Sequence, residues 1–396
     1  MISQTPDALE LGRSAGKRAD VRFSTPLKPA DPAQQPFRVL HIVPRLFGRD
    51  HGVVGGAERY ALELARHMAQ EIPTSLVSFG GAEESHETIG QLEVHVIGRP
   101  WCVRGQQSNP MSWRLWHHIR KAQIVHCHQQ HIVASSFAAA ACRLSGRKVF
   151  VSDLGGGGWD ISSYISTDRW YHAHLHISEY SRTVFGQAGQ PWARVILGGV
   201  DTEKFHPDPA PREKPRVLFV GRLMPHKGVN YLLEALPADV ELELIGQPYH
   251  RPFVEHLKQL VQGKQVTFRS DCNDEELVAA YQRALCVVLP SVYETMYGVK
   301  SNVPELLGQT LLEGMACGAP AICTDVASMP EVVENGVTGF VVPPNDPSAL
   351  RQKLIWLRDH REQAQAMGAA GRARVLRLFT WPSVVRRCLD AYQSCR

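Results

Sequence analysis

Long hydrophobic runs are missing from this sequence of 396 residues. No stretch reaches the roughly 18 consecutive apolar residues that a helix needs to cross a bilayer, and the chain begins with no signal-peptide pattern. The most apolar segment, residues 132–142, is short, rich in alanine and interrupted by Ser135 and Ser136. We therefore expect a cytoplasmic protein, at most peripherally attached to the cytoplasmic face of a membrane.

Strong charge of one sign and paired cysteines are also missing. The 43 Lys and Arg and the 39 Asp and Glu leave a net charge of +4, too small to predict nucleic acid as a partner. The nine cysteines are scattered, with no Cys-x-x-Cys pair, so we expect reduced thiols. No Asp-x-Asp element is well placed to carry a catalytic metal ion, and we expect neither a metal nor another cofactor.

The length of the chain predicts two domains, because single hydrophobic cores stop growing beyond about 250–300 residues. Residues 1–36 carry five prolines, both signs of charge and few large apolar side chains. That composition is typical of a disordered tail, with a partner-docking arm as the alternative. Ordered structure is expected to begin at residue 37.

The first ordered segment predicts a strand, a glycine loop and a helix. Residues 37–43 are a short apolar run, and Gly55 and Gly56 precede residues 57–68, in which apolar side chains recur at helical spacing. This sequence of elements is the first unit of a nucleotide-binding α/β layer. The two glycines are candidates for close backbone contact with a ligand, and a tight turn is the alternative.

A basic helix with two tryptophans, Trp113 and Trp116, is predicted near residues 112–120. Such a helix can lie on a bilayer surface. We favour the alternative, in which Trp116 and Ile119 pack on the sheet and the charged side chains are solvated.

Three histidines follow a buried strand within residues 124–131. Because side chains alternate along a strand, His126 and His128 share one side of it, and the carboxyl end of a parallel strand borders the ligand crevice. A metal site is the alternative, since His-x-His occurs in zinc sites. No carboxylate and no further Cys or His cluster stands nearby in the sequence to complete one, so we favour contact with a substrate.

The second half opens with a strand followed by two cations. Residues 215–220 are mostly apolar, and Gly221, Arg222 and Lys227 come directly after them. The fork of an Arg and the mobile charge of a Lys together suit a diphosphate. The alternative is a solvated basic turn.

Residues 305–313 combine two glutamates with a glycine and an apolar sequence. On one helix, Glu305 and Glu313 would be separated by about 12 Å along the axis and about 80° around it. The free N–H groups at a helix start attract phosphate, so we expect a long ligand with an anionic centre. The residues expected to offer these amides are Gly308, Gln309, Thr310 and Leu311.

Taken in order, these elements resemble retaining glycosyltransferases of family four, which have the GT-B fold. The glutamates match the Glu-seven residues-Glu signature of the family, with Leu307 where Phe is usual. Residues 55–58 resemble its Gly-Gly-Ala-Glu element, residues 125–128 its Val-His-x-His element, and residues 221–228 its Gly-Arg-x-x-x-x-Lys-Gly element. The resemblance covers about residues 37–396.

One departure from the family pattern lies directly before the first glutamate. Residues 295–304 are inserted between Glu294 and Glu305, so that either could be the first glutamate of the signature. Only Glu305 has the correct spacing to Glu313 and is followed by Gly308, and we choose it. We expect the inserted segment to project over the cleft and to shape what the protein accepts.

The resemblance implies two doubly wound, Rossmann-like parallel-sheet domains that face each other across a cleft. The N-terminal, acceptor-side domain would span residues 37–198 and the C-terminal donor domain residues 199–379. A last helix, residues 380–396, would cross back to the first domain.

The resemblance also implies roles for the candidate residues. Arg222 and Lys227, with the amides of residues 308–311, would neutralise the leaving nucleotide diphosphate. Glu313 would accept hydrogen bonds from the ribose, and Glu305 would hold sugar hydroxyls.

A histidine of the Val-His-x-His element contacts the donor sugar near the reacting centre in this family. His128 is our choice for that role, with His126 second. Gly55 and Gly56 would let backbone N–H groups approach the donor phosphates or the acceptor.

The implied function is a retaining, metal-independent hexosyltransferase. It would move a sugar from a nucleotide-diphosphate sugar, such as a UDP-sugar or GDP-mannose, to a glycan or lipid-linked glycan in polysaccharide or glycoconjugate synthesis. The alternatives are a non-catalytic sugar-binding protein on the same fold, a nucleotide-sugar epimerase and a phosphorylase. A phosphorylase would normally carry a pyridoxal phosphate lysine motif, which we do not find in this sequence.

Overall fold

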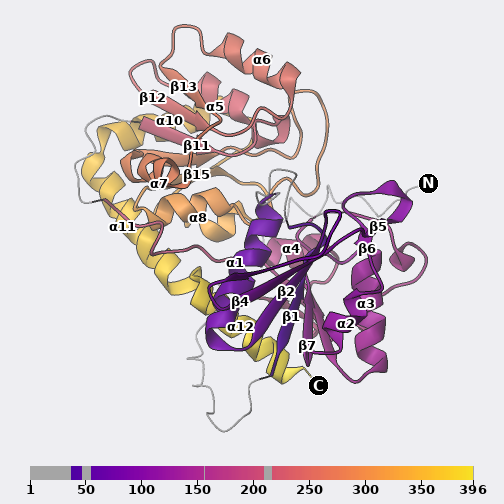
Figure 1. Cartoon of the computed structure of the whole chain (residues 1–396). Coiled ribbons are helices and arrows are strands. Elements are labelled where there is room, and N and C mark those ends of the chain that lie inside the picture. The colour runs from indigo at the N-terminus through magenta and orange to yellow at the C-terminus, as the bar shows by residue number, and fades with distance from the viewer. Residues whose placement is uncertain (1–36, 47–54, 156, 209–215, 396) are drawn as a thin grey trace. The chain divides into compact units, whose positions relative to one another are not determined.

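The computed structural model describes residues 37–46, 55–155, 157–208 and 216–395, so the predicted tail at residues 1–36 lies outside the described residues. Residues 37–396 form one compact unit that contains both large sheets (Figure 1). The domain boundary proposed between residues 198 and 199 stays a prediction.

Eight strands form the first sheet, in the order β10-β9-β8-β7-β1-β2-β4-β3. All neighbouring strands are parallel except the pair β3 and β4. The strands are β1 (Val39–Ile42), β2 (Thr74–Phe79), β3 (Ser85–Ile89), β4 (Leu92–Ile97), β7 (Ile124–Cys127), β8 (Lys148–Val151), β9 (Ala173–His176) and β10 (Ala193–Val195). A separate antiparallel pair joins β5 (Trp101–Cys102) to β6 (Pro110–Met111).

Six strands form the second sheet, in the order β13-β12-β11-β14-β15-β16, and every neighbouring pair is parallel. Numbered within the sheet this is 3-2-1-4-5-6, the order of a doubly wound dinucleotide-binding fold. The strands are β11 (Arg216–Val220), β12 (Glu241–Ile245), β13 (Val266–Arg269), β14 (Cys286–Leu289), β15 (Ala321–Thr324) and β16 (Gly339–Val342).

The described residues contain twelve α-helices and four short 3-10 helices. The helices around the first sheet are α1 (Gly56–Glu71), α2 (Leu115–Ile119), α3 (Val133–Leu144) and α4 (Glu179–Val184), with η1 (Val103–Gly105), η2 (Ile161–Ser163) and η3 (Asp168–Trp170). The others are η4 (Pro225–Lys227), α5 (Val229–Ala235), α6 (Arg251–Leu260), α7 (Asp274–Arg283), α8 (Gln309–Ala316), α9 (Met329–Val332), α10 (Pro347–Asp359), α11 (Arg361–Leu378) and α12 (Trp381–Ser394). None of the described helices is both long and apolar enough to span a bilayer.

Alternation along β1 explains why helices cover both faces of the first sheet. Leu40 and Ile42 are buried in a cluster shared with residues of α2 and α3. Val39, which points to the opposite face, is buried with Leu64 and Met68 of α1. Both faces of a parallel strand are thus removed from water, which is why β1 is apolar almost throughout.

Helix α12 packs against elements of the first sheet. The Tyr392 hydroxyl lies 2.8 Å from Nδ1 of His126 on β7, and the Lys148 amine donates to the Tyr392 carbonyl at 3.1 Å. At the start of the helix, the Trp381 ring lies 5.2 Å from the ring of Tyr60 on α1. Helix α12 therefore packs against β7, which carries His126, and against its neighbour β8.

The predicted helix at residues 112–120 is shorter than expected, and one of its packing assignments is wrong. Only Leu115–Ile119 is α-helical, and Leu115 and Ile119 are the side chains that pack inward. Trp116 does not pack on the sheet: it is 41% exposed, and Trp113 is 76% exposed. A five-residue helix buries only one narrow stripe, and both tryptophans lie outside it.

A buried carboxylate holds together one end of the second sheet. Glu243 on β12 is 4% exposed, and both of its oxygens accept from Nη2 of Arg283 on α7, at 2.9 and 2.8 Å. Arg216 on β11 and Arg269 on β13 lie 3.6 and 3.5 Å away. One side chain thus links three adjacent strands and a helix.

Glu243→Gln should lower the free energy of unfolding by about 2–3 kcal/mol, because it leaves cations without their buried partner. Urea denaturation followed by circular dichroism measures the loss. The matched control is Glu255→Gln, since Glu255 is exposed and pairs only with Lys258 on the same helix, and we expect less than about 0.5 kcal/mol there. Equal losses in the two variants would show that Glu243 has no special structural role.

Candidate active site

The candidate residues lie where the strand order of each sheet reverses. In the first sheet, the order reverses between β1 and β7; Gly55 and Gly56 begin α1 after β1, and His128 directly follows β7. In the second sheet, the reversal falls between β11 and β14, and Arg222 and Lys227 follow β11. Ligands of open α/β sheets bind outside the carboxyl ends of the strands at such points.

The loop after β11 holds its two cations in a tightly packed turn. Lys227 ends the 3-10 helix η4, and Gly228 follows with φ of 66°. A Cβ at Gly228 would come within 2.0 Å of the carbonyl oxygen of Pro290, so only glycine fits. The guanidinium carbon of Arg222 lies 5.5 Å from the centre of the Tyr249 ring.

Lys227 and Glu305 are brought into direct contact. The amine Nζ lies 2.5 Å from Oε2 of the carboxylate, and both side chains are largely shielded from water. The sequence placed one of them at the diphosphate and the other at the sugar, so these two parts of the expected site are adjacent. Without a ligand, Glu305 supplies the negative charge that balances Lys227.

The prediction that Glu305 and Glu313 lie on one helix is wrong. Helix α8 begins at Gln309, and Gly308 caps it in the left-handed conformation, with φ of 78°. Glu305 therefore lies in the loop before the helix, and Glu313 lies inside it. The glycine breaks the helical path between them, so the predicted axial separation does not apply.

Not all four residues expected to offer amides to an anion at the start of α8 can do so. Leu311 is fully buried, and its N–H donates to the Gly308 carbonyl at 3.0 Å, so neither its side chain nor its amide is directed to a ligand. Gln309 donates from its side chain to the Gly199 carbonyl at 3.1 Å. The backbone amides of Gly308, Gln309 and Thr310 remain as candidates for an anion.

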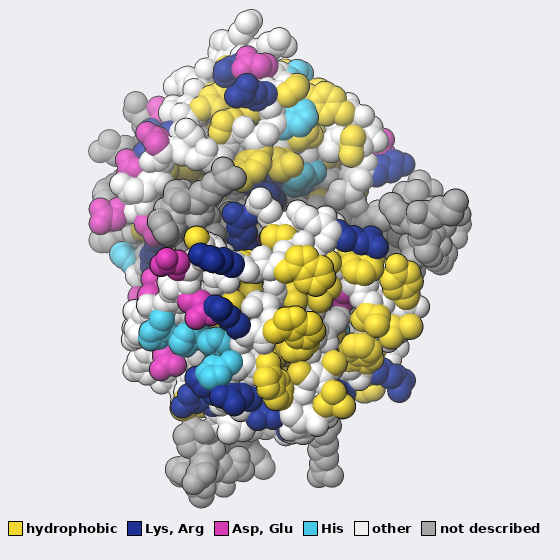
Figure 2. Space-filling view, turned by 45° about the vertical axis from the view of Figure 1, so that its right-hand side comes forward, with side chains coloured by type: hydrophobic (Ala, Val, Ile, Leu, Met, Phe, Trp, Pro, Cys, Tyr) yellow, Lys and Arg dark blue, Asp and Glu magenta, His cyan; other side chains and the backbone are white. Residues whose placement is uncertain are grey.

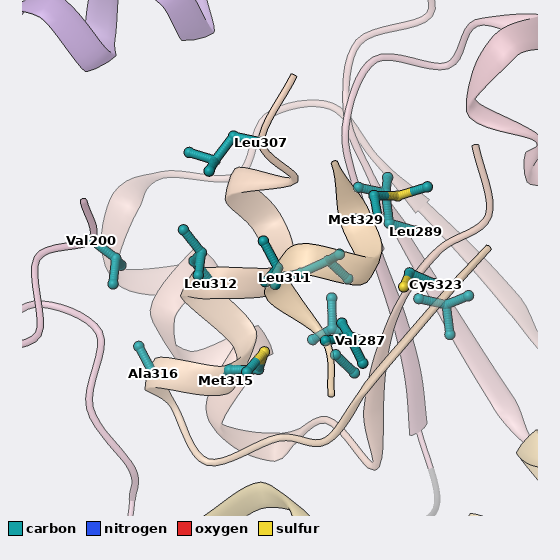
Figure 3. Packing of buried hydrophobic residues seen from close by; sticks show 14 of the residues in the cluster. Val200, Val287, Leu289, Leu307, Leu311, Leu312, Met315, Ala316, Cys323 and Met329 are labelled. Carbon is teal, nitrogen blue, oxygen red and sulfur yellow. The ribbon is translucent and has the colours of Figure 1, made fainter. Parts of the chain in front are cut away.

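Apolar packing fixes the start of α8 in place. Figure 3 shows Leu311 of α8 among buried side chains that include Val287 of β14 and Met329, and a Cβ at Gly371 of α11 would lie 3.3 Å from the Met315 side chain. Leu307, which replaces the usual Phe, packs so closely on Gly198 that a Cβ there would come within 2.0 Å of it. A side chain at position 198 would therefore collide with Leu307.

Glu313 is held in a shielded position on α8. It is 8% exposed, and its Oε2 accepts from the Tyr281 hydroxyl at 2.7 Å. Burial raises the pKa of Glu313, and the hydrogen bond from Tyr281 opposes that rise. Tyr281 was not among the residues chosen from the sequence, because an apolar helix position gives no sign of such a contact.

A carboxylate near the glycine turn of the first sheet interacts with the cation of the second. Burial raises the pKa of Glu58, in the first turn of α1, and the positive charge of Arg222 opposes the rise. A Cβ at Gly55 would come within 2.8 Å of the Glu58 carboxylate. The turn formed by Gly55 and Gly56 thus lies beside a carboxylate that feels the charge of Arg222, and its place at the donor phosphates or the acceptor stays a prediction.

His128 belongs to a buried histidine cluster that also includes His41 on β1. Nε2 of His128 lies 2.8 Å from Nδ1 of His41, and Nε2 of His41 lies 3.3 Å from the Met68 sulfur. The rings of His126 and His128 lie 4.4 Å apart, which confirms that they share one side of the strand. His41 was missed in the sequence because it is 85 positions away from His126.

The hydrogen bonds of the cluster fix the tautomer of His128. A thioether cannot donate, so Nε2 of His41 carries a hydrogen and Nδ1 of His41 is an acceptor. Nε2 of His128 must therefore donate to it, which leaves a lone pair on Nδ1 of His128. That atom is buried and has no partner among the described residues, so His128 offers an acceptor for a hydroxyl group.

The same reasoning fixes His126. The Ser152 hydroxyl donates to the Leu175 carbonyl at 2.7 Å, so it accepts from Nε2 of His126 at 2.9 Å. Nδ1 of His126 then accepts from Tyr392. Both nitrogens of His126 are committed, and His128 alone in this pair has a free one.

Two groups of the described residues have the composition and spacing of metal ligands. The first is His41, His126 and His128, so the third ligand that the sequence did not show is present. Hydrogen bonds already use both nitrogens of His41 and His126, however, and a metal would have to replace them. The second group is Glu63, His67 and Asp201, where Arg66 pairs with both carboxylates.

Family profiles match most of the chain. Residues 54–204 match the profile described as Glycosyltransferase Family 4, and residues 200–374 match that of Glycosyl transferases group 1. The chain belongs to glycosyltransferase family 4.

Relatives of this glycosyltransferase share about a third of the aligned residues. The GDP-mannose-dependent alpha-(1-6)-phosphatidylinositol monomannoside mannosyltransferase of Mycobacterium tuberculosis H37Rv is 31% identical over 236 residues, 54% of this chain and 60% of that protein. D-rhamnosyltransferase WbpZ of Pseudomonas aeruginosa is 34% identical over 198 residues, 47% of this chain and 49% of that protein. The chain thus matches only about half to 60% of the length of these relatives.

Solved structures share the fold over nearly the whole chain. Sucrose-phosphate synthase from Thermosynechococcus elongatus has a TM-score of 0.68 at 19% identity, covering 90% of this chain and 98% of that one. Anabaena HepE in complex with UDP and glucose has a TM-score of 0.69 at 18% identity, covering 90% and 100%. These likenesses confirm the predicted GT-B fold.

Two contacts of the glycosyltransferase join elements of the two sheets next to the site. The Ser178 hydroxyl donates to the Leu306 carbonyl at 2.7 Å. Glu331 accepts from the backbone amides of Glu179 and Tyr180, at 2.8 and 2.6 Å, at the start of α4. Sequence reasoning missed Glu331 because a carboxylate that caps a helix elsewhere in the chain leaves no local signal.

The inserted segment of the glycosyltransferase, residues 295–304, contacts elements of both sheets. The Tyr180 hydroxyl of α4 donates to the Asn302 carbonyl at 2.5 Å, and the Tyr297 ring lies 5.9 Å from His250 after β12. Tyr249, next to His250, packs against Arg222. The segment therefore lies next to the residues that pack against Arg222, and its predicted part in selecting substrates stays a prediction.

The tautomer of His128 can be tested without knowing any substrate. Wild-type protein labelled with ¹⁵N-histidine should show His128 with hydrogen on Nε2 only, and the ring should still be neutral at pH 6.5, because burial lowers its pKa well below 6.5. Long-range ¹H–¹⁵N correlation spectra report both properties.

His41→Leu removes the acceptor and should let His128 populate both tautomers. His41→Asn is the matched control, since its Oδ1 takes the place of Nδ1 and still accepts. If the spectrum of His128 is the same in the Leu variant as in the wild type, the hydrogen bond from Nε2 of His128 to Nδ1 of His41 does not fix the tautomer.

Proposed function

We propose that this glycosyltransferase transfers a hexose from a nucleotide-diphosphate sugar to an acceptor hydroxyl with retention of configuration. The observation that supports this most is the contact of Lys227 with Glu305 at the reversal point of the second sheet, beside Arg222. A group that exchanges its carboxylate partner for a phosphate is suited to a leaving diphosphate.

The site stabilises charge that develops on the leaving group. As the bond from the anomeric carbon to the diphosphate breaks, Arg222 and Lys227 neutralise the phosphate oxygens, and the amides of Gln309 and Thr310 add two dipoles. Since side chains supply the positive charge, we propose that transfer is metal-independent and uses no cofactor. Binding of the diphosphate to Lys227 frees Glu305 to accept hydrogen bonds from sugar hydroxyls.

Retention follows from a front-face path. The acceptor oxygen bonds to the anomeric carbon on the face from which the diphosphate departs, and the proton of the acceptor passes to the released phosphate oxygen. This path needs no carboxylate on the opposite face. His128 supports it by offering Nδ1 to a hydroxyl of the donor sugar, and Glu313 by accepting from the ribose.

We further propose that the acceptor is a glycan or lipid-linked glycan at the cytoplasmic face of a membrane. The names of two relatives support a place in cell-surface glycoconjugate synthesis: one is a phosphatidylinositol monomannoside mannosyltransferase and another a D-rhamnosyltransferase. The nucleotides named differ: the relative depends on GDP-mannose, whereas the solved HepE complex contains UDP. The base of the donor nucleotide is therefore the first property to test.

A thermal-shift screen against UDP-, GDP- and ADP-sugars should find a donor that raises the melting temperature. At a free donor concentration of about 100 times Kd, binding stabilises the protein by roughly 2.7 kcal/mol. The double variant Arg222→Ala, Lys227→Ala should lose this shift. Lys258→Ala, an exposed Lys paired with Glu255 on α6, should keep it.

The two glutamates should then separate binding from transfer. Glu305→Ala should abolish transfer to an acceptor, whereas Glu313→Ala should weaken donor binding by roughly tenfold to a hundredfold through the lost charged hydrogen bond. Release of nucleoside diphosphate measures transfer, and calorimetry measures binding. Full activity of the Arg222 and Lys227 double variant would refute the diphosphate assignment.

A further inference from the structure

An exposed aromatic surface lies on the side of the first sheet covered by α2 and α3. Trp101 is 65% exposed, Trp113 76% and Tyr164 73%, and Leu144 at the end of α3 is 91% exposed. Figure 2 shows hydrophobic side chains gathered there in one field, with Lys and Arg at its edges. We call this surface, formed by Trp101, Trp113, Trp116, Leu144, Tyr164 and Ile165, the aromatic face.

Contacts between neighbouring elements make the aromatic face a built surface. The Trp113 ring meets Phe137 of α3 edge-on, with ring centres 5.4 Å apart. The Trp159 ring contacts Tyr164 on one side and lies 3.8 Å from the Arg104 guanidinium. Side chains from distant parts of the sequence thus support one another, and yet the exposed tryptophans gain little burial from it.

The segment that builds this surface concentrates positive charge. Residues 99–171 contain nine Lys and Arg, three Asp and no Glu, a formal charge of +6, whereas the whole chain carries only +4. Asp160 is 1% exposed and bonded to Ser136, and the Asp153 side chain is 10% exposed. Seven of the nine cations are exposed, and only one of these seven, Arg114, has an ion pair among the described residues, with Glu84 at 2.7 Å, so positive charge predominates around the aromatic side chains.

This chemistry fits the surface of an anionic bilayer better than a second copy of the chain. Tryptophan and tyrosine favour the headgroup region of membranes, and Lys and Arg are attracted to anionic lipids. In a symmetric dimer through the same face, the cations of both copies would meet. An anionic lipid surface supplies the opposite charge over the whole patch.

One loop connects the aromatic face to the candidate active site. After β8, a Cβ at Gly155 would lie 3.1 Å from Leu306, directly after Glu305. Gly157 accepts from the Gln129 side chain at 2.7 Å, and the loop then continues to Tyr164 and Ile165 on the exposed surface. A molecule anchored at the aromatic face would meet the candidate active site along this loop.

We propose that the aromatic face docks the protein onto a bilayer that contains anionic lipids, and that residues 157–165 lead the headgroup of a membrane-anchored acceptor to the site. The second part rests on the proposed function. Docking itself requires only the exposed tryptophans and tyrosine and the surrounding cations.

Co-sedimentation of the full chain with vesicles tests the docking. Vesicles of equal parts phosphatidylcholine and phosphatidylglycerol should bind the wild type and release it at high salt, whereas pure phosphatidylcholine should bind it weakly. Trp113→Ala with Tyr164→Ala should reduce the partition coefficient by about tenfold or more, because both side chains insert. Both are largely exposed, so the melting temperature should not change.

Leu376→Ala is the matched control, because Leu376 is 47% exposed on α11, outside the face, and its binding should equal that of the wild type. Absence of sedimentation with anionic vesicles, or equal binding by the double variant, would overturn the proposal. So would self-association of the wild type without lipid that the double variant abolishes, since a second copy would then cover the face.

The donor screen distinguishes failure of this inference from failure of the proposed function. If a nucleotide sugar stabilises both the wild type and the double variant but vesicles bind neither, only the docking is refuted. If vesicles bind as expected and no donor stabilises the protein, docking stands and the proposed transfer fails. If both hold, Trp113→Ala alone, which lies outside residues 157–165, should lose activity on an acceptor in vesicles and keep the release of nucleoside diphosphate with a soluble acceptor.

Discussion

The reversal of strand order in each parallel sheet is the constraint on which the candidate site depends. At a reversal the loops after two adjacent strands separate to opposite faces, which leaves a crevice at their carboxyl ends. His128 is held at one reversal and Lys227 at the other. The loops alone do not determine where His128 and Lys227 lie. Each loop begins at a strand, β7 or β11, that is held by a parallel neighbour on both sides.

The charged groups of the site balance one another when no ligand is bound. Lys227 pairs with Glu305, and the positive charge of Arg222 acts on the half-buried Glu58. Such pairs keep a shielded crevice free of uncompensated charge, whose burial is costly. Under the proposed function, an entering anion would replace the carboxylates as partner of the cations, and the released carboxylates would become hydrogen-bond acceptors for hydroxyl groups.

The first sheet has different chemistry on its two faces. On the face covered by α1 and α12, buried histidines exchange hydrogen bonds in a fixed direction, which leaves one lone pair on His128. On the opposite face, α2 is too short to cover its tryptophans, and Trp113 is open to solvent. The loop after β8 joins these two environments, because it begins beside Leu306 and ends at the exposed surface.

The sequence by itself determined the fold class, the family and the place of most candidate residues. Buried parallel strands require apolar runs, and turns that meet a ligand or a neighbouring backbone require glycine, so both features are local and visible. The pairs Gly55 and Gly56, and Arg222 and Lys227, were found in this way. His126 and His128 were placed on one side of a strand by alternation alone.

Only the tertiary structure decided which of these residues meet. His41 joins His128 because β1 and β7 are neighbours in space and far apart in the chain, and Tyr281 joins Glu313 for the same kind of reason. The position of Glu305 depended on the left-handed Gly308, because the helix begins only after this residue and Glu305 therefore lies outside it. Local patterns record the backbone requirements of each segment, whereas pairing between distant segments follows from packing, which no local pattern encodes.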